Sequence, residues 1–368
     1  MLITYVCLCG YKCYLCKENE AIMKNKNPRG LFDETFRLEK LSKQGDPLLL
    51  LKAKINWEIF RPTLASIFSK EGKGQGGREP YNYLMMFKIL ILQRYYNLSD
   101  DQTEYQILDR LSFMRFLELE LSDKVPDSKT IWLFKETIAK SGKTEELFKT
   151  FEELLASKGY IGKEGKIVDA SFVEVPRQRN SREENKQIKE GKVPEEWQKN
   201  PHKLSQKDTD ARWTKKNNET FFGYKNHVKV DTKSKLINNY EVTSASEHDS
   251  QELDNLLEEK DAGQDFHADS AYTGEDQEKS IERVKMNNCV IEKGYKNKPL
   301  TDEQKASNKV KSKTRVRVEH VFGFVENSMN GSYIRCIGMI RAEATIGLMN
   351  LTYNIFRYIQ LNKVPSMR

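Results

Sequence analysis

Three acidic residues of the chain have the types and positions needed to hold divalent metal ions. Asp169 follows the apolar pair Ile167-Val168, and Asp269 follows the short segment at 266–268, so both are expected at strand ends. Glu319 lies in a basic, amphipathic stretch at residues 315–323 that is expected to be helical. Two short carboxylates on strands and a longer one on a helix can converge on a pair of Mg²⁺ or Mn²⁺ ions. Basic surroundings suit such a site to phosphodiester chemistry on nucleic acid.

A run of basic residues leads directly into Glu319. Between positions 293 and 317 only Asp302 and Glu303 oppose the basic residues, which are Lys293, Lys296, Lys298, Lys305, Lys309, Lys311, Lys313, Arg315 and Arg317. The formal charge of the chain is +7, with 61 basic and 54 acidic residues, and this excess alone is weak support for nucleic-acid binding. Because the run adjoins Glu319, we expect its last five members, from Lys309 to Arg317, to face DNA. A solvated helix surface, with Arg315 paired to Glu319 one turn later, is the alternative.

The hydrophobic pattern divides the chain into a helical part and an α/β part. From about residue 31 to residue 158 apolar residues recur at helical spacing; Pro62 is expected to end one helix and Asp127 to begin another. After Gly159 the pattern predicts strands at 166–175, 224–231, 236–243, 265–268 and 288–292 and helices at 249–257, up to Glu319, and at 342–360. His248 and Asp249 are expected to cap the helix that follows them. This order of strands and helices predicts a mixed α/β sheet flanked by helices and preceded by a helical domain.

The expected domains are a helical one at residues 23–159 and an α/β one at 160–368. Several short helices could form a helix-turn-helix-like DNA-binding unit or an ordinary bundle, and the pattern leaves both open. A polar stretch at about 176–220 is expected to be a partly disordered insertion in the α/β domain. Trp197 and Trp213 lie in it, where they could stack on unpaired bases or anchor the insertion, and we favour anchoring.

Residues 1–22 differ from the rest of the chain. Four cysteines crowd into this segment, too close together for the two separated pairs of a usual zinc site: Cys7, Cys9, Cys13 and Cys16. We interpret the segment as an extension ahead of a more natural start at Met23, and we expect it to be dispensable. Cys289 and Cys336 are isolated and are expected to pack. No apolar stretch reaches the roughly 20 residues that cross a bilayer, so we expect a cytoplasmic protein without a membrane partner.

The order Asp, Asp, Glu and the residues around it resemble the DDE transposases of bacterial insertion sequences, most closely the insertion sequence 5 family within the wider insertion sequence 4-like group. In that family the first Asp lies in a strand such as Ile167-Val168-Asp169. The second lies in Asp-x-x-Tyr, matched by Asp269 and Tyr272, and the third lies in Arg-x-x-x-Glu, matched by Arg315 and Glu319 with His320 after it. The resemblance spans about residues 23–360.

The resemblance implies a ribonuclease H-like catalytic domain after a helical DNA-binding domain. It implies that Asp169, Asp269 and Glu319 are the catalytic residues and the ligands of two Mg²⁺ or Mn²⁺ ions. The expected activity is cleavage of DNA at terminal inverted repeats and transfer of the 3′ ends to target DNA, by a homodimer in the synaptic complex. The expected location is the bacterial cytoplasm, at the nucleoid when DNA is bound. Tyr272, His320 and His227 join the expected DNA-binding residues, although His227 could instead be a packed strand histidine.

One part of the family signature is incomplete. The full form is Tyr-x2-Arg-x3-Glu-x6-Lys, and here Ser312 occupies the Tyr position and Glu326 the Lys position. In relatives these residues contact transposon-end DNA, so their loss leaves the activity of this copy open. Two other functions therefore stay under consideration. One is a catalytically silent, transposase-derived DNA-binding protein, and the other is a metal-dependent DNA nuclease without strand transfer.

Overall fold

The computed structural model describes residues 30, 32–68, 79–295 and 299–362. The four clustered cysteines near the start of the chain lie outside the described residues. The chain forms two compact units, up to Asp46 and from Pro47 onward. In the first unit the described helix is α2 (Asp33–Lys43), with acids in its first turn and lysines in its last. These charges complement the helix dipole.

The described residues between 47 and 158 form a series of helices, as the sequence predicts. The elements are α3 (Pro47–Lys54), η1 (Trp57–Phe60), α4 (Arg61–Phe68), α5 (Tyr83–Tyr95), α6 (Asp100–Asp109), α7 (Leu111–Leu117), α8 (Ser128–Ser141) and α9 (Thr144–Ser157). Asp127 caps α8, because its side chain accepts a hydrogen bond from the backbone N–H of Thr130. The prediction for Pro62 is wrong. Pro62 lies in the first turn of α4, where proline is tolerated because the backbone there needs no N–H donor.

A six-stranded mixed sheet forms the centre of the α/β part. Its strands are β1 (Gly165–Glu174), β2 (Arg212–Lys216), β3 (Glu219–Asp231), β4 (Ile237–Ser244), β5 (Asp265–His267) and β6 (Asn287–Asn288). β3 pairs antiparallel with β1, β2 and β4, whereas β1–β5 and β5–β6 are parallel. Along the order β4-β3-β1-β5-β6, the pairs β4–β3 and β3–β1 are antiparallel, and the pairs β1–β5 and β5–β6 are parallel. This is the ribonuclease H-like arrangement.

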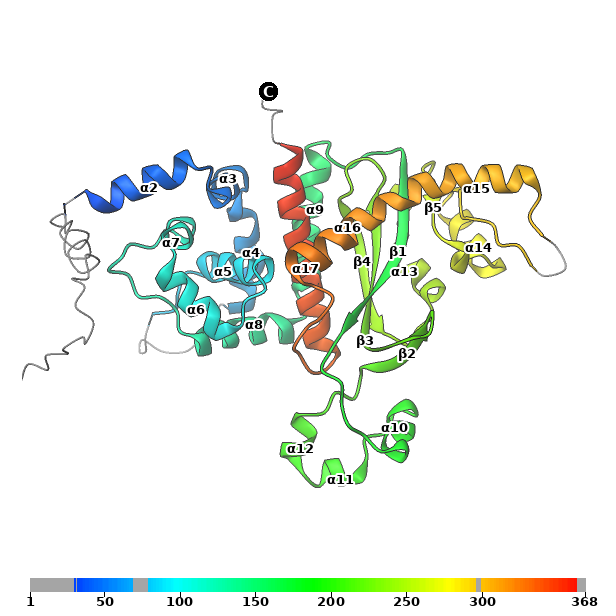
Figure 1. Cartoon of the computed structure of the whole chain (residues 1–368), viewed down its shortest axis with the longest axis horizontal. Coiled ribbons are helices and arrows are strands. Elements are labelled where there is room, and N and C mark those ends of the chain that lie inside the picture. Colours follow the sequence, from blue (N-terminus) through cyan, green and yellow to red (C-terminus); the bar gives the residue numbers. More distant parts are fainter. Residues whose placement is uncertain (1–29, 31, 69–78, 296–298, 363–368) are drawn as a thin grey trace, which may run out of the picture. The chain divides into compact units, whose positions relative to one another are not determined.

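The two faces of the sheet pack into different cores. Ile167 points into the larger core with α9, α16 and α17, whereas its neighbour Val168 packs with Phe266 and with the helices α13 and α14. The remaining elements are η2 (Asp249–Glu252), α13 (Leu253–Leu256), η3 (Glu259–Asp261), η4 (Ser270–Tyr272), α14 (Glu275–Arg283), α15 (Asp302–Arg315), η5 (Val316–Val318), α16 (Glu319–Gly323), η6 (Phe324–Ser328) and α17 (Met339–Leu361). The sheet is therefore flanked by helices on both faces (Figure 1).

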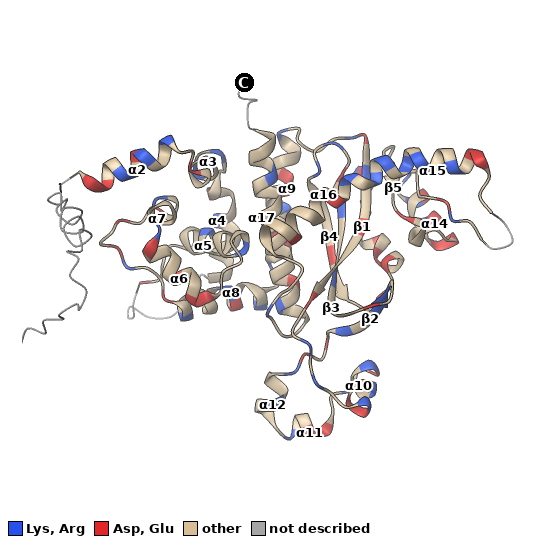
Figure 2. Ribbon diagram, viewed as in Figure 1, with Lys and Arg blue, Asp and Glu red and all other residues tan. Residues whose placement is uncertain are grey.

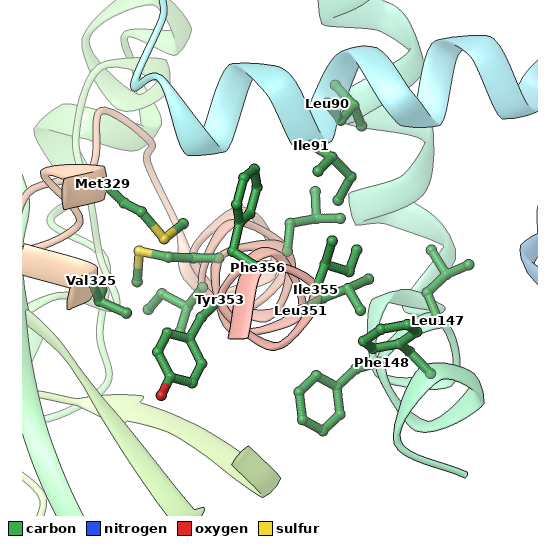
Figure 3. Close-up of a cluster of buried hydrophobic side chains, with 14 of the residues drawn as sticks. Leu90, Ile91, Leu147, Phe148, Val325, Met329, Leu351, Tyr353, Ile355 and Phe356 are labelled. Carbon is green, nitrogen blue, oxygen red and sulfur yellow. The ribbon is translucent and has the colours of Figure 1, made fainter. Parts of the chain in front are cut away.

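α17 joins the helical segment to the sheet in one core. Most of its 23 residues are buried. Figure 3 shows Phe356 and Ile355 of α17 near Ile91 of α5 and Phe148 of α9, and Phe356 stacks on Tyr95 with ring centres 3.6 Å apart. No helix within the described ranges is long and apolar enough to cross a membrane.

The polar insertion is more ordered than predicted. It forms α10 (Arg182–Lys189), α11 (Glu195–Gln198) and α12 (Pro201–Ser205) before β2. Trp197 is buried, and its indole N–H donates to Glu184 Oε1 at 2.6 Å, in keeping with an anchoring role. Trp213 stays 43% exposed and contacts Phe222, with the Arg177 guanidinium over its ring.

Candidate active site

The sheet register brings Asp169 and Asp269 together. β1 and β5 run parallel, with Gly165 opposite Asp265 and Ile167 opposite His267. Continuing this register by two residues places Asp169 beside Asp269, where β5 has just ended. Neighbouring strands lie about 4.8 Å apart, so the topology alone juxtaposes two acids that are far apart in sequence. The backbones of β1 and β5 lie close together where their pairing begins, because a Cβ added to Gly165 would lie 2.9 Å from the backbone oxygen of Asp265.

Asp169 is held by two donors inside a largely buried position. Its Oδ1 accepts the backbone N–H of Ala170 at 2.9 Å, and its Oδ2 accepts Arg315 Nη1 at 2.7 Å. The pKa of Asp169 is raised to about 6, mainly by burial and to a smaller extent by the nearby carboxylates Asp269 and Glu319. The Ala170 N–H and the Arg315 guanidinium oppose these effects without cancelling them. The three acids are therefore close enough for their charges to repel one another.

Asp269 is oriented by the turn that follows β5. Its Oδ1 accepts the backbone N–H of Ala271 at 2.8 Å, so the side chain caps η4. Tyr272 ends this short helix and is fully buried in the core that α13 and α14 form on the sheet. Burial, followed by the charges of Asp249, Asp169 and Asp269, raises the pKa of Tyr272 well above its ordinary value. A packed tyrosine thus fixes the turn that presents Asp269.

Arg315 links Asp169 to Glu319. Its Nη2 lies 3.5 Å from Glu319 Oε1, one helical turn later, while its Nη1 binds Asp169. The sequence offered the pair with Glu319 as an alternative to a DNA contact and gave no sign of the pair with Asp169. Within the described residues, the oxygens of Asp169, Asp269 and Glu319 do not all lie within 4.8 Å of one another. The guanidinium supplies the positive charge between two of the acids.

The basic residues before Glu319 lie along α15 and η5, where Figure 2 shows Lys and Arg positions in blue, and they differ in their contacts. Lys311 faces the sheet, where its Nζ donates to the Val290 backbone oxygen at 3.0 Å and lies 3.5 Å from Glu292. Lys309 and Lys313, four residues apart, are exposed, and neither is ion-paired within the described chain. Arg317 donates to the Thr232 backbone oxygen at 2.9 Å, at the turn between β3 and β4. Lys309 and Lys313 are thus the best placed for a partner outside the chain.

The three further residues expected to contact DNA are placed differently. His320 is exposed next to Glu319. Tyr272 and His227 are fully buried. His227 Nε2 lies 2.8 Å from the Thr243 hydroxyl, and burial lowers the pKa of His227 to about 4, so the ring is neutral at pH 7. Buried at these positions, neither side chain offers a surface for DNA.

Asp249 is a fourth acid near the site, and the sequence pointed to a different role for it. His248 does cap η2, with its ring Nδ1 accepting the Ser250 N–H. Asp249 instead accepts Lys225 Nζ at 2.7 Å, and its charge acts on both Tyr272 and His227. Its contact with the middle of β3 is non-local, and no local pattern around residue 249 indicates it.

Two family models match the chain. The model described as Transposase DDE domain matches residues 161–355, and the model described as Transposase domain (DUF772) matches residues 36–137. The first spans more than half of the chain, which therefore belongs to the DDE transposase family, a family of DNA-transposing enzymes that use divalent metal ions. Among solved structures the chain is similar to piggyBac transposase in a cryo-EM structure of its synaptic complex with hairpin DNA. That match has a TM-score of 0.42 and 12% sequence identity, over 86% of this chain and 75% of that chain.

Proposed function

We propose that the protein is an insertion-sequence transposase of the insertion sequence 5 type. It would bind the terminal inverted repeats of its element, cleave phosphodiester bonds there and transfer the 3′ ends to target DNA, as a homodimer in the synaptic complex and in a bacterial cytoplasm. The observation that supports this most is the meeting of Asp169 and Asp269, with Glu319 tied to Asp169 through Arg315. Asp269 follows the end of β5, as expected, whereas Asp169 lies within β1 and not at its end.

The donor set fits divalent metal ions with a preference for oxygen ligands. Asp169, Asp269 and Glu319 would hold Mg²⁺ or Mn²⁺, in a pair of ions. The Arg315 guanidinium balances negative charge at two of these acids, which supports a cation at this position. When bound, the metal would supply charge stabilisation to a phosphodiester and its attacking water or hydroxyl.

The side chains around the acids have definable tasks. The pKa of Asp169 near 6 leaves this carboxylate mostly ionised at pH 7 while the repulsion from its neighbours stays unrelieved. A cation placed among the acids would relieve that repulsion and release Arg315. A released guanidinium has two parallel N–H groups that match two phosphate oxygens, so Arg315 is suited to position the scissile phosphate.

The exposed face of α15 would carry the DNA backbone toward these acids. Lys309 and Lys313 lie one turn apart on that face, without a partner within the described residues. Lysines at this spacing can each neutralise a phosphate, which makes binding salt-dependent and nearly independent of sequence. The residues in place of the family's Tyr and Lys, Ser312 and Glu326, add no positive charge, so more of the affinity would rest on the lysines.

A single assay separates the proposal from its alternatives. Purified protein is incubated with Mg²⁺ or Mn²⁺, a labelled DNA that carries the element's inverted repeats, and a second, unlabelled DNA. We expect nicking at the repeat ends and joining of the 3′ ends to the second DNA. Binding alone would support the silent DNA-binding protein, and nicking without joining would support the nuclease.

Matched variants assign the chemistry to the acids. Glu319→Gln keeps the size of the side chain and removes its charge, so cleavage should be lost while DNA binding persists. Glu282→Gln is the control, because Glu282 is an exposed glutamate on α14 that pairs with no described residue. Normal cleavage by Glu319→Gln, or equal loss in both variants, would remove Glu319 from the proposed catalytic set.

A further inference from the structure

A second group of potential metal ligands lies upstream of Asp269 on the same strand. Asp265 and His267 are two residues apart on β5, so their side chains share a face. Cys289 follows β6, the neighbouring strand, and its backbone N–H donates to the Phe266 oxygen at 2.8 Å. One ligand atom from each of the three side chains lies within 4.8 Å of the other two. The predicted catalytic set does not include this group.

The histidine of this group has an unsatisfied polar atom. His267 is only 9% exposed, and its Nδ1 is buried without a hydrogen-bond partner among the residues that the structure describes. A buried polar atom without a partner costs free energy, so such atoms call for an explanation. Asp265 Oδ1 accepts Asn287 Nδ2 at 3.0 Å, which leaves oxygen lone pairs free for a further partner. Cys289 is a free, half-buried thiol.

The chemistry of the group differs from that of the three acids. An oxygen, a nitrogen and a sulfur ligand together suit a borderline-soft ion, whereas Mg²⁺ takes oxygen ligands. At metal–ligand distances of about 2.0–2.3 Å, tetrahedral ligand atoms lie roughly 3.3–3.8 Å apart. Atoms within 4.8 Å of one another can close to that spacing by small side-chain rotations.

We propose that Asp265, His267 and Cys289 form a zinc-type metal site that ties the β5–β6 edge of the sheet together just ahead of Asp269. With an ionised aspartate, a neutral histidine and a thiolate, the ligands carry two negative charges and balance an ion of charge two. Burial raises the pKa of the Cys289 thiol, and binding releases that proton to solvent. Three protein ligands leave the fourth tetrahedral position to water.

The charges that face this group limit which ion it takes. Lys311 and Arg317 act on His267 from the α15–η5 side, and Lys311 also acts on Cys289. Their repulsion acts on any ion of charge two, so a bound ion must be held by strong ligand bonds, such as the bond of zinc to a thiolate. The site does not depend on the proposed transposase activity, because its ligands are not the acids assigned to that chemistry.

Cobalt is a direct probe of the site, because Co²⁺ bound to a thiolate absorbs strongly in the near ultraviolet. Titration uses the full-length chain with Cys7, Cys9, Cys13 and Cys16 replaced by serine in every sample, so that those cysteines contribute nothing. We expect one Co²⁺ per chain to give the thiolate band, Zn²⁺ to displace it, and the thermal midpoint to rise with free Zn²⁺.

Three variants and two controls decide the outcome. Cys289→Ser should abolish the band, and Asp265→Asn and His267→Gln should each weaken Co²⁺ binding by at least roughly 100-fold. Cys336→Ser removes the other described cysteine and should keep the band, and so should Asp169→Asn, which affects only the predicted catalytic acids. Circular dichroism verifies that each variant is folded. No band in the parent chain, a band that survives Cys289→Ser, or one that disappears in Cys336→Ser would overturn the proposal.

Discussion

Replacing Asp169 by asparagine should stabilise the metal-free protein at neutral pH. The carboxyl group of Asp169 has an ordinary pKa of 3.8, and burial with nearby negative charge raises that pKa to about 6 in the folded protein. The folded protein therefore holds this proton more tightly than the unfolded chain does. At pH values above 6 the folded protein must bear a charge that the surroundings disfavour, and its free energy of unfolding is lower as a result.

The difference between the two pKa values gives the size of the effect. From 3.8 to about 6, at 1.36 kcal/mol per pKa unit, the charged form costs about 3 kcal/mol of stability above pH 7. The side chain is only 15% exposed, so solvent screening lowers this figure little. Asparagine has the same shape without the charge, so Asp169→Asn should raise the free energy of unfolding by up to about 3 kcal/mol at pH 8. Because stability from this group falls as pH rises from about 4 to above 6, the gain should shrink to about 1 kcal/mol at pH 4.5.

Urea unfolding in the presence of EDTA, at pH 4.5 and pH 8, measures both values. Asp276→Asn is the control, since Asp276 is 90% exposed on α14 and its replacement should change stability by less than about 0.5 kcal/mol. A loss of stability in Asp169→Asn at pH 8, or the same difference at both pH values, would refute the reasoning that burial and the neighbouring carboxylates disfavour the ionised form of Asp169 in the folded protein.

Two further predictions concern the surface of α15 and the polar insertion. Lys309→Ala and Lys313→Ala should each lower DNA affinity by a similar factor for all DNA sequences. Each should also reduce the slope of log affinity against log salt concentration by about one, as measured by fluorescence anisotropy from low to moderate salt. Unchanged slopes would support a solvated helix face. Trp197→Phe removes the indole N–H that donates to the mostly buried Glu184, so it should destabilise the insertion by about 1 kcal/mol. The loss should be seen as faster proteolysis between residues 176 and 220. An unchanged digestion rate would contradict the anchoring role.

The sequence predicted elements well where the signal is local. The strand that carries Asp169 and the helix that Asp127 begins follow from alternation and from capping chemistry, and both are present. Pro62 was misplaced because proline both ends helices and occupies their first turn, and only tertiary context decides between the two. The helices of the polar insertion are short and lack an apolar period, so composition alone indicated disorder.

The sequence suggested the residues of the proposed site but not the contacts between them. Asp169 lies beside Asp269 because β1 pairs with β5 in a particular register, and no local sequence pattern indicates this pairing. The same limit hid the bond from Arg315 to Asp169 and the approach of Asp249 to Tyr272. Cys289 was interpreted as a packing residue because its partners, Asp265 and His267, are distant in sequence. The domain boundary near residue 160 stays a prediction, since α17 packs against both parts.

The most direct test of the proposed site replaces each acid in turn by cysteine. A thiolate is a poor ligand for Mg²⁺ and a better one for Mn²⁺, so metal preference reports ligation at that position. If Asp169, Asp269 and Glu319 hold the metal, each Asp→Cys or Glu→Cys variant should lose DNA nicking with Mg²⁺ and regain part of it with Mn²⁺, whereas the alanine variants should regain none. Nicking by the cysteine variants with Mg²⁺ at the rate of the unmodified protein would contradict the proposal.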